Sequence, residues 1–358
     1  MIRISEIVLP GHPDKFCDQI ADAIIAECVK IDSDAYGQIE VAVWSCDLWI
    51  NGGICTRKPF TRDLRDIIIE TGVAIGFVPG NHIDASRYTV HSALCQTVDD
   101  PAQFTAKVND QSIVIGWAGY DENTHWLPPE HYIAHVFREA LIKASRRGPL
   151  AGQGPDGKIM VRIREEGHCW IVEHVLVTIQ QLATARFLDV CDAVASTLED
   201  AYQKTRDRDP RWAERWQEIG LTINPNGPLV EAGSNGDNGQ TGRKLVMDFY
   251  GPRIPIGGGA LSGKHMTHID RIGAYAARHA AICAVRSGAS ECSVRVAYAP
   301  NTHAPLDVSY DMSGRGKRQP TEFFTHNAAA SRYPAECVST LLAQGTHFID
   351  MSLPWNLG

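Results

Sequence analysis

The chain has 358 residues, of which 44% are hydrophobic and 21% charged, as is ordinary for a soluble globular protein. This length predicts two or three domains. The formal net charge of -8 argues against a general nucleic-acid or membrane-surface binder. A polyanion would therefore have to be met by a local cluster of basic side chains.

The ten cysteines form no C-x-x-C pair, and the chain is too long for a disulfide-stapled miniprotein. We therefore expect reduced thiols and a cytoplasmic location. The N-terminus has no signal-peptide layout, and no apolar run reaches membrane-spanning length. No membrane or nucleic-acid partner is expected.

Helix-like and strand-like segments alternate along the chain, which predicts an α+β fold. Apolar periodicity predicts helices at 16–31, 61–76, 129–147, 187–203, 267–288 and 334–344. Strands are predicted at 38–50, 158–164, 170–180, 244–250, 292–298 and 304–310. Thr267 and Asp270 form a capping-box pattern, and Gly288 is a natural helix stop. Residues 97–110 are expected to form a mobile loop, and the charged segment 204–218 is expected to face solvent.

The first motif with chemical content is Gly11-His12-Pro13-Asp14-Lys15, directly before the first predicted helix. A helix N-terminus presents free N–H groups that suit an anion, and proline there is preorganised. His12 and Lys15 add donors, while Asp14 offers a hard oxygen suited to Mg²⁺. A capped helix start with exposed charges is the competing interpretation of so short a string.

Two glycine-rich loops follow within thirty residues of each other, and each ends on basic residues. The first reads GDNGQTGRK and ends at Arg243 and Lys244, and the second reads GGGALSGK and ends at Lys264. Glycines let the backbone approach oxygens closely, and the basic side chains suit phosphate. The loops are not Walker A motifs, because His265 follows Lys264.

These motifs, in this order, resemble the signature of the S-adenosylmethionine synthetases, with Asp270-Arg271 completing the pattern. Further matches extend the resemblance over essentially the whole chain; they include Asp110-Gln111, Ala134-His135, Ile223-Asn224-Pro225 and Pro354-Trp355. Because several independent motifs keep their order, chance is a poor explanation.

The resemblance implies three similar α+β domains related by a pseudo-threefold axis. It also implies a homodimer or dimer of dimers, in which two subunits pack sheet to sheet with the active sites between them. We divide the chain into an N-terminal part (1–110), a central α+β domain (111–235) and a C-terminal part (236–358), with segments that interleave.

The implied reaction is attack of a sulfur nucleophile, methionine or a similar thioether or thiol, on C5′ of ATP. Tripolyphosphate leaves and is then cleaved. By resemblance, the catalytic residues are His12, Lys158, Arg243 and Lys264. The residues expected to bind ATP are Lys15, Asp110, Asp237 and Lys244. Two Mg²⁺ ions are expected at Asp14 and Asp270, and a K⁺ ion at Glu40.

The departures from the family lie on the sulfur-substrate side. Gly53 stands where the family has a glutamate, and His268 where it has a lysine, both of which contact methionine. Gln96 matches a third methionine contact only across a gap. Either the enzyme still uses methionine, with water or a protonated His268, helped by a nearby carboxylate, in place of the lysine, or the acceptor is a different thioether or thiol that lacks the zwitterionic head. We favour the second, because two changes coincide.

Two other classes stay open. An acceptor-independent ATP or tripolyphosphate hydrolase would keep the same phosphate ligands. A non-catalytic ATP-binding paralogue is less favoured, because the basic residues and both aspartates are present. His131 and His135 have zinc-ligand spacing, but no third ligand completes the pattern, so packing is the better interpretation. We assign His265 and His268 to the substrate side and not to a metal site.

Overall fold

A computed structural model describes residues 1–358 and contains three β-sheets. Sheet I has the strand order β4-β3-β2-β9, with β2 at Tyr36–Trp44, β3 at Asp47–Thr56, β4 at Thr89–Val98 and β9 at Gly239–Gln240. Sheet II has the order β1-β6-β7-β8, formed by Ile2–Val8, Gly157–Glu166, Cys169–Ile179 and Gly220–Ile223. Sheet III has the order β11-β10-β5, formed by Asp307–Gly314, Ala289–Tyr298 and Ser112–Gly119.

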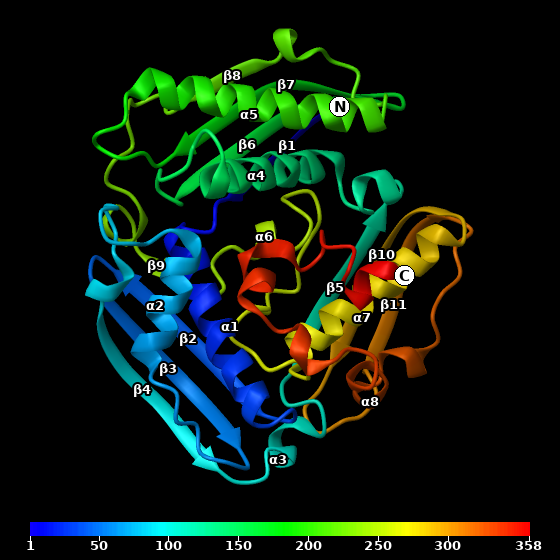
Figure 1. The fold of residues 1–358 in the computed structure, drawn as a ribbon. Helices are drawn as coiled ribbons and strands as arrows, with labels where there is room; N and C mark the ends of the chain where they lie inside the picture. The colour runs from blue at the N-terminus through cyan, green and yellow to red at the C-terminus, as the bar shows by residue number, and fades with distance from the viewer.

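Each sheet carries a long helix on its inner face, as Figure 1 shows. Helix α1 (Pro13–Ile31) packs on sheet I, α4 (Pro129–Arg147) on sheet II and α7 (Ile269–Arg286) on sheet III. Helix α5 (Phe187–Arg208) lies beside α4, and α2 (Leu64–Ile75) beside α1. Short helices complete the chain: α3 (Ala102–Thr105), α6 (Leu245–Asp248), α8 (His326–Ala330) and α9 (Pro354–Leu357). The predicted α+β fold with three similar units is confirmed.

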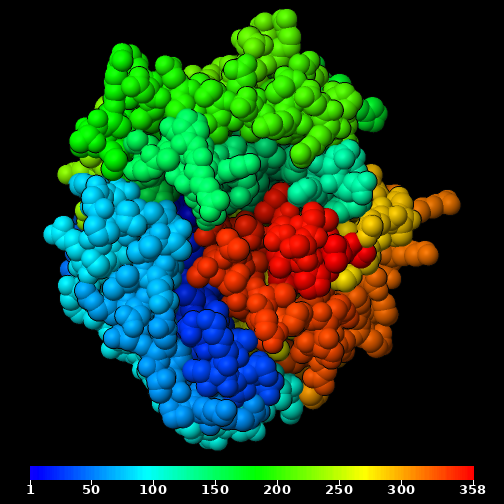
Figure 2. All heavy atoms as spheres, viewed as in Figure 1, coloured from blue at the N-terminus to red at the C-terminus, as the bar shows by residue number.

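The hydrophobic interior is divided unequally. One core of 55 buried residues joins sheets I and III through α1 and α7, and a second core of 24 fills sheet II, α4 and α5. Shared close packing therefore fixes the N-terminus of α1 relative to that of α7. The C-terminal segment, red in Figure 2, lies in the middle of the face shown there, between α1 and the C-terminal sheet.

Most predicted helices are confirmed within a few residues, but several local predictions are wrong. The strand predicted at 38–50 is a hairpin, in which Ser45 has a positive φ and the chain returns as β3. The strand predicted at 244–250 contains the short helix α6, which buries Asp248. The helix predicted at 334–344 is replaced by a 3₁₀ turn and a separate π-type turn, with Gly345 at φ 101°.

The capping box at Thr267 is also wrong, because His268 is the N-cap of α7. Part of the segment 204–218 is not solvent-facing, since Trp212 is fully buried with its ring 4.8 Å from that of Trp170. The loop predicted at 97–110 contains the end of β4 and helix α3.

All ten cysteines are unpaired, as expected. No helix has the length and apolarity needed to span a membrane. The division at 110 and 235 stays a prediction; β1 and β6, from different parts of it, pair in one sheet.

Candidate active site

Both glycine-rich loops pair with the same strand, β2. Gly239 and Gln240 pair with β2 at Val43 and Ala42, while Lys264 bridges to Gln38. Residues 38 and 42 are four steps apart, so the two attachment points are separated by about 13 Å. The loops that end on basic residues therefore lie side by side on the same edge of the fold.

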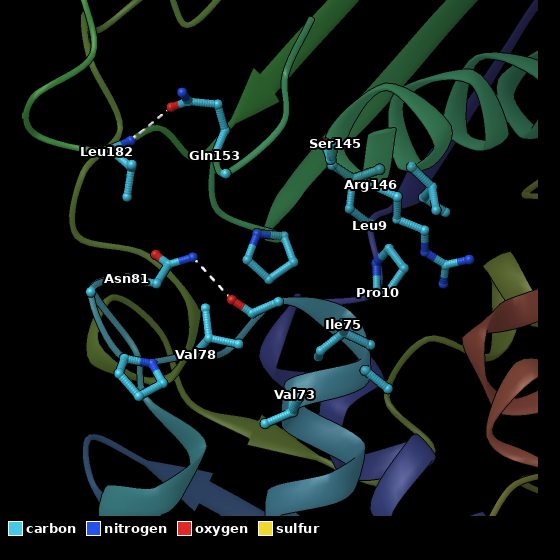
Figure 3. A pocket seen from close by; sticks show the side chains of 17 residues that line it. Leu9, Pro10, Val73, Ile75, Val78, Asn81, Ser145, Arg146, Gln153 and Leu182 are labelled. Carbon is cyan, nitrogen blue, oxygen red and sulfur yellow. Dashed lines mark hydrogen bonds between the residues drawn. The ribbon is translucent and has the colours of Figure 1, made fainter. Parts of the chain in front are cut away.

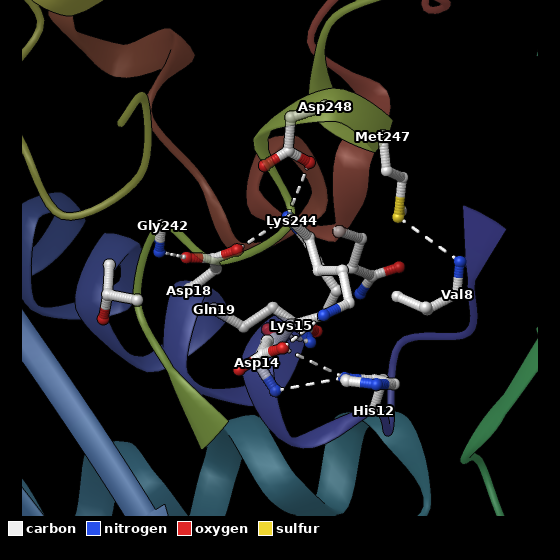
Figure 4. A network of polar contacts seen from close by, with 12 residues as sticks. Val8, His12, Asp14, Lys15, Asp18, Gln19, Gly242, Lys244, Met247 and Asp248 are labelled. Carbon is white, nitrogen blue, oxygen red and sulfur yellow. Dashed lines mark hydrogen bonds and ion pairs between the residues drawn. The ribbon is translucent and has the colours of Figure 1, made fainter. Parts of the chain in front are cut away.

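The first cluster forms at the N-terminus of α1, as Figure 4 shows in part. The Gln240 N–H donates to Asp14 Oδ1 at 2.9 Å, and Lys244 forms an ion pair with Asp14 Oδ2. Arg243 Nε lies 3.6 Å from Asp14 Oδ1. A Cβ on Gly239 would lie 2.4 Å from the Pro13 carbonyl carbon, so only glycine allows this loop to reach the helix.

His12 is the N-cap of α1 and is almost fully buried. Its Nδ1 accepts a hydrogen bond from the Asp14 N–H at 3.2 Å, so the proton of the neutral ring is on Nε2. Burial, reinforced by the positive charge of Lys244, lowers the pKa of His12 to about 3, although Asp14 opposes this shift. His12 is therefore a neutral N–H donor at physiological pH, with Lys158 among its positive neighbours.

The second cluster forms in the same way at the N-terminus of α7. His268 Nδ1 accepts from the Asp270 N–H at 3.2 Å, repeating the His12–Asp14 arrangement. Lys264 Nζ lies 2.6 Å from Asp270 Oδ2, and Ser112 donates to Asp270 Oδ1 at 2.5 Å. Asp110 presents a carboxylate within 4.8 Å of His268 and Asp270 ligand atoms. A His-x-Asp pair with a loop lysine thus occurs twice in one chain.

Carboxylates along α1 join the two clusters. Asp18 accepts from the Gly242 N–H at 2.9 Å, and Asp22 accepts from the Gly263 N–H at 2.8 Å. Arg271 of α7 pairs with Asp22 at 2.5 Å. Asp14 and Asp22 are eight residues apart on α1, or about 12 Å along its axis. Arg243, Lys244 and Lys264 are therefore gathered along one helix, in two groups.

Sequence reasoning missed Asp18 and Asp22, although a signal was present. Together with Asp14 they recur every four residues along α1, so they share one face. Carboxylates on the buried face of a helix require partners. Here those partners are the backbone N–H groups and cations of the glycine-rich segments.

Lys15 does not belong to either cluster, and the prediction that it contacts ATP is wrong. Its side chain is fully buried and its Nζ lies 2.8 Å from Asp18 and 2.7 Å from Asp248 (Figure 4). Burial opposes its charge, but the two carboxylates raise the pKa of Lys15 overall. The Lys15 ammonium group is therefore neutralised by Asp18 and Asp248 inside the protein and does not reach a ligand.

The protonated His268 proposed to replace the family's lysine is also contradicted. His268 is 1% exposed, and burial with nearby His265 and Lys264 lowers its pKa to about 2. Its Nδ1 is already an acceptor in the cap, so the ring is neutral with Nε2–H as a donor. His268 therefore supplies a hydrogen-bond donor and no positive charge.

The remaining predicted site residues lie on sheet I and in the first glycine-rich loop. Glu40 lies on β2 near Lys264 and Asp18, and burial raises the pKa of its carboxyl. Asp237 is an exposed residue of the first loop. Gly53 pairs with Cys95, and Gln96 with Ile54. Neighbouring strand residues point to opposite faces, so Gln96 points away from the face that contains position 53, and the two do not form one subsite.

The two histidine pairs have internal partners. His131 and His135 are fully buried with their Nε2 atoms 3.2 Å apart, and His131 also bonds Ser5 and Met247. Burial lowers the pKa of His131 to about 4. His265 bonds the Gly37 carbonyl at 3.0 Å. These contacts show that the rings of His131, His135 and His265 are part of the packed interior, as predicted for His131 and His135.

A cavity of about 480 Å³ lies beside Pro10, between the C-terminal ends of α2 and α4 (Figure 3). Its lining is largely apolar and includes Val73, Ile75 and Ile142. It contains none of the predicted site residues. A second cavity, of about 460 Å³, is lined by Asp110 and His268 and therefore adjoins the second cluster.

Three sheets around three inner helices, with two cation–carboxylate clusters held by glycine-rich loops, define an α+β protein with a candidate polyanion site. Residues 1–98 match the S-adenosylmethionine synthetase N-terminal domain, and residues 232–338 match the C-terminal domain. The chain belongs to the S-adenosylmethionine synthetase family. Membership of this family supports a transferase that binds ATP.

The fold is similar to that of a solved structure described as an unusual S-adenosylmethionine synthetase from Campylobacter jejuni. The TM-score is 0.86 at 24% sequence identity, over 99% of this chain and 97% of the other. At this identity the likeness concerns the fold.

Proposed function

We propose that the chain transfers the adenosyl group of ATP to a sulfur nucleophile. The sulfur lone pair forms a bond to C5′, the C5′–O5′ bond breaks, and tripolyphosphate leaves and is then hydrolysed. The observation that carries the proposal is the repeated His-x-Asp and lysine arrangement at the N-termini of α1 and α7. A leaving group with several negative charges needs fixed donors and cations where its charge develops.

The residues of the two clusters have proposed roles that agree with their environments. The neutral His12 donates its Nε2–H to the departing O5′. Lys158, Arg243, Lys244 and Lys264 neutralise the phosphate oxygens, and Asp110 and Asp237 bind the ribose or amino-acid side. Arg243 and Lys244 are held by Asp14, and Lys264 is held by Asp270, so these three cations need little reorganisation when charge develops.

Mg²⁺ fits Asp14 and Asp270, which present hard carboxylate oxygens beside the phosphate-binding lysines. Asp14 accepts hydrogen bonds from the Gln240 N–H and Lys244, Asp270 accepts them from Ser112 and Lys264, and each carboxylate keeps further lone pairs for a cation. Two Mg²⁺ ions bound there would neutralise phosphate charge. Glu40, on β2, is the proposed position of a K⁺ ion.

We also propose a homodimer, or a dimer of dimers, with active sites between subunits. The two clusters of one chain lie about 12 Å apart along α1, so each is suited to form half of a site. The outer face of sheet I exposes Trp44 and Trp49, at 52% and 39%. Large exposed aromatic residues on a flat sheet face are typical of an interface. Replacing Trp49 by Glu should give monomers in sedimentation measurements and abolish transfer.

The test is product analysis of ATP, Mg²⁺ and K⁺ incubated with a panel of sulfur compounds that includes methionine. An adenosylated sulfonium or thioether product, detected by mass spectrometry, supports the proposal. Lys158→Met should reduce its formation by about 10²-fold, whereas Lys143→Met, on the exposed surface of α4, should not. Phosphate release without any adenosylated product would instead identify an ATP or tripolyphosphate hydrolase.

A further inference from the structure

The cavity of about 480 Å³ beside Pro10 lies where the two hydrophobic cores of the protein meet (Figure 3). One wall is the C-terminal end of α2, where Ile75 packs against the larger core. The opposite wall includes Leu9 of the smaller core and Ile142 of α4, which packs against that core. Apolar side chains from both cores therefore line one cavity, and its volume is in the range of small-molecule sites, about 300–1,000 Å³.

Two proline rings lie between these walls and add apolar surface without a backbone donor. Pro10 and Pro155 have no N–H group, and the Pro155 carbonyl accepts from the Gly11 N–H at 3.0 Å. A Cβ on Gly11 would lie 2.6 Å from the Pro155 carbonyl carbon, so these two segments are in close contact. Water beside this surface has few polar partners, and its displacement by an apolar ligand is favourable.

The only charged residue that lines the cavity is Arg146, near the C-terminus of α4. Its side chain is exposed and makes no ion pair or hydrogen bond within the chain. Figure 3 shows it reaching from α4 toward Pro10. No carboxylate lines the cavity, so the charge of Arg146 is not neutralised there. An unpaired guanidinium group at the edge of an apolar cavity is complementary to an anionic head group.

Ser145 adds a second donor next to this guanidinium group. It lines the same cavity, and its hydroxyl makes no hydrogen bond within the chain. The amide side chains of the lining bond instead to other lining residues. Asn81 Nδ2 donates to the Gly76 carbonyl at 3.1 Å, and Gln153 Oε1 accepts from the Leu182 N–H at 2.9 Å (Figure 3). One cation and one free hydroxyl therefore stand together on α4 beside an apolar surface.

We infer that this cavity binds a small amphipathic anion, an apolar body that carries one carboxylate or sulfonate group. The body packs between Ile75 and Ile142, and the head group accepts from the Arg146 guanidinium and the Ser145 hydroxyl. A single head group is favoured over a polyphosphate, because no second cation lines the cavity. The site is separate from both cation–carboxylate clusters, and the inference does not depend on adenosyl transfer.

The test uses 8-anilinonaphthalene-1-sulfonate, an aromatic anion whose fluorescence rises in an apolar site, and N-phenyl-1-naphthylamine, its neutral counterpart without the sulfonate. Both compounds are titrated into the full-length protein, with and without ATP and Mg²⁺. The sulfonate should bind at one molecule per chain and more tightly than the neutral compound. ATP and Mg²⁺ should not displace it, because the cavity contains none of the residues assigned to ATP.

Variants locate the bound anion. Arg146→Met should weaken binding of the sulfonate by about 5-fold, the upper range for an exposed ion pair, and leave the neutral compound unchanged. Arg147→Met, the adjacent cation outside the lining, should change neither. Val73→Glu puts a carboxylate on the apolar wall and should weaken binding of both compounds by about 10-fold. Leu188→Glu, on the exposed surface of α5, is its matched control and should have no effect.

Several results would overturn the inference. Absence of sulfonate binding, equal sulfonate affinities in the wild type, Arg146→Met and Val73→Glu, or displacement by ATP would show that the probe does not occupy this cavity. Equal affinities of the wild type for the two compounds would remove the anionic head group from the inference. Because Val73 is 49% exposed and Arg146 is also exposed, both variants should keep the wild-type unfolding temperature, and a loss of affinity then concerns folded protein.

Discussion

His12 provides a test in which catalysis and stability can be separated. Its Nδ1 accepts from the Asp14 N–H at 3.2 Å and so caps α1, whereas its Nε2–H is assigned to the departing O5′. His12→Ala removes both interactions. His12→Asn removes the donor at the reacting oxygen and retains a side chain that is among the best N-caps.

The two contributions have different magnitudes. Loss of one preorganised donor at a developing negative charge raises the barrier by about 3 kcal/mol, or roughly 10²-fold in rate. Loss of an N-cap lowers the free energy of unfolding by about 1 kcal/mol. Both variants should therefore lose about two orders of magnitude in kcat, while His12→Ala alone should show the additional loss of stability.

The assays are kcat at saturating ATP and acceptor, and urea unfolding of the same preparations. Because the pKa of His12 is lowered to about 3, the wild-type ring is neutral throughout pH 5–8, and no fall in kcat near pH 6.5 should arise from it. A His12→Asn variant with wild-type kcat would refute the assignment of Nε2–H to the leaving oxygen. A fall in kcat with a midpoint near 6.5 that disappears in the variant would refute the neutral ring.

Three further predictions concern stability and loop packing. Lys15→Met leaves two buried carboxylates without their counter-charge and should cost about 3–5 kcal/mol of unfolding free energy in urea titrations, more than loss of a surface phosphate contact would. Gly259→Ala places a Cβ 2.4 Å from the Asp270 carboxyl carbon and should weaken ATP binding measured by calorimetry, whereas Gly53→Ala, whose nearest new contacts are at 3.9 Å, should not. The fully buried His131 and His265 have pKa values of about 4 against about 6.5 when unfolded, so the unfolded chain binds more protons below pH 6.5. Stability should be constant with respect to these groups above pH 6.5 and fall by about 1.4 kcal/mol per histidine for each pH unit down to about 4, as urea titrations at pH 7.5, 6.0 and 5.0 can show.

The local features that sequence predicts well are those decided by near neighbours in the chain. The period of apolar residues placed α1, α2, α4 and α5 within a few residues, because an amphipathic helix is defined by contacts along its own length. Gly76, at φ 110°, ends α2 as predicted. The order of the basic and glycine-rich motifs was enough to indicate the family.

Other features depended on partners distant in the chain. Asp248 was predicted to lie in a strand, but in the fold its carboxylate is the partner of Lys15, 233 residues away, and the segment is a short helix. The same contact removes Lys15 from the set of ATP ligands. No local pattern distinguishes a lysine that reaches solvent from one that is neutralised inside the protein.

By itself, the sequence determined which residues carry charge and where the glycines lie. It therefore indicated that local clusters of basic side chains could bind a polyphosphate. Only the tertiary structure decided that these residues form two groups along α1 and that His268 is a neutral cap. The reason is that burial and pairing set the charge and reach of a side chain. Both depend on segments hundreds of residues apart that become neighbours only when the sheets and helices pack.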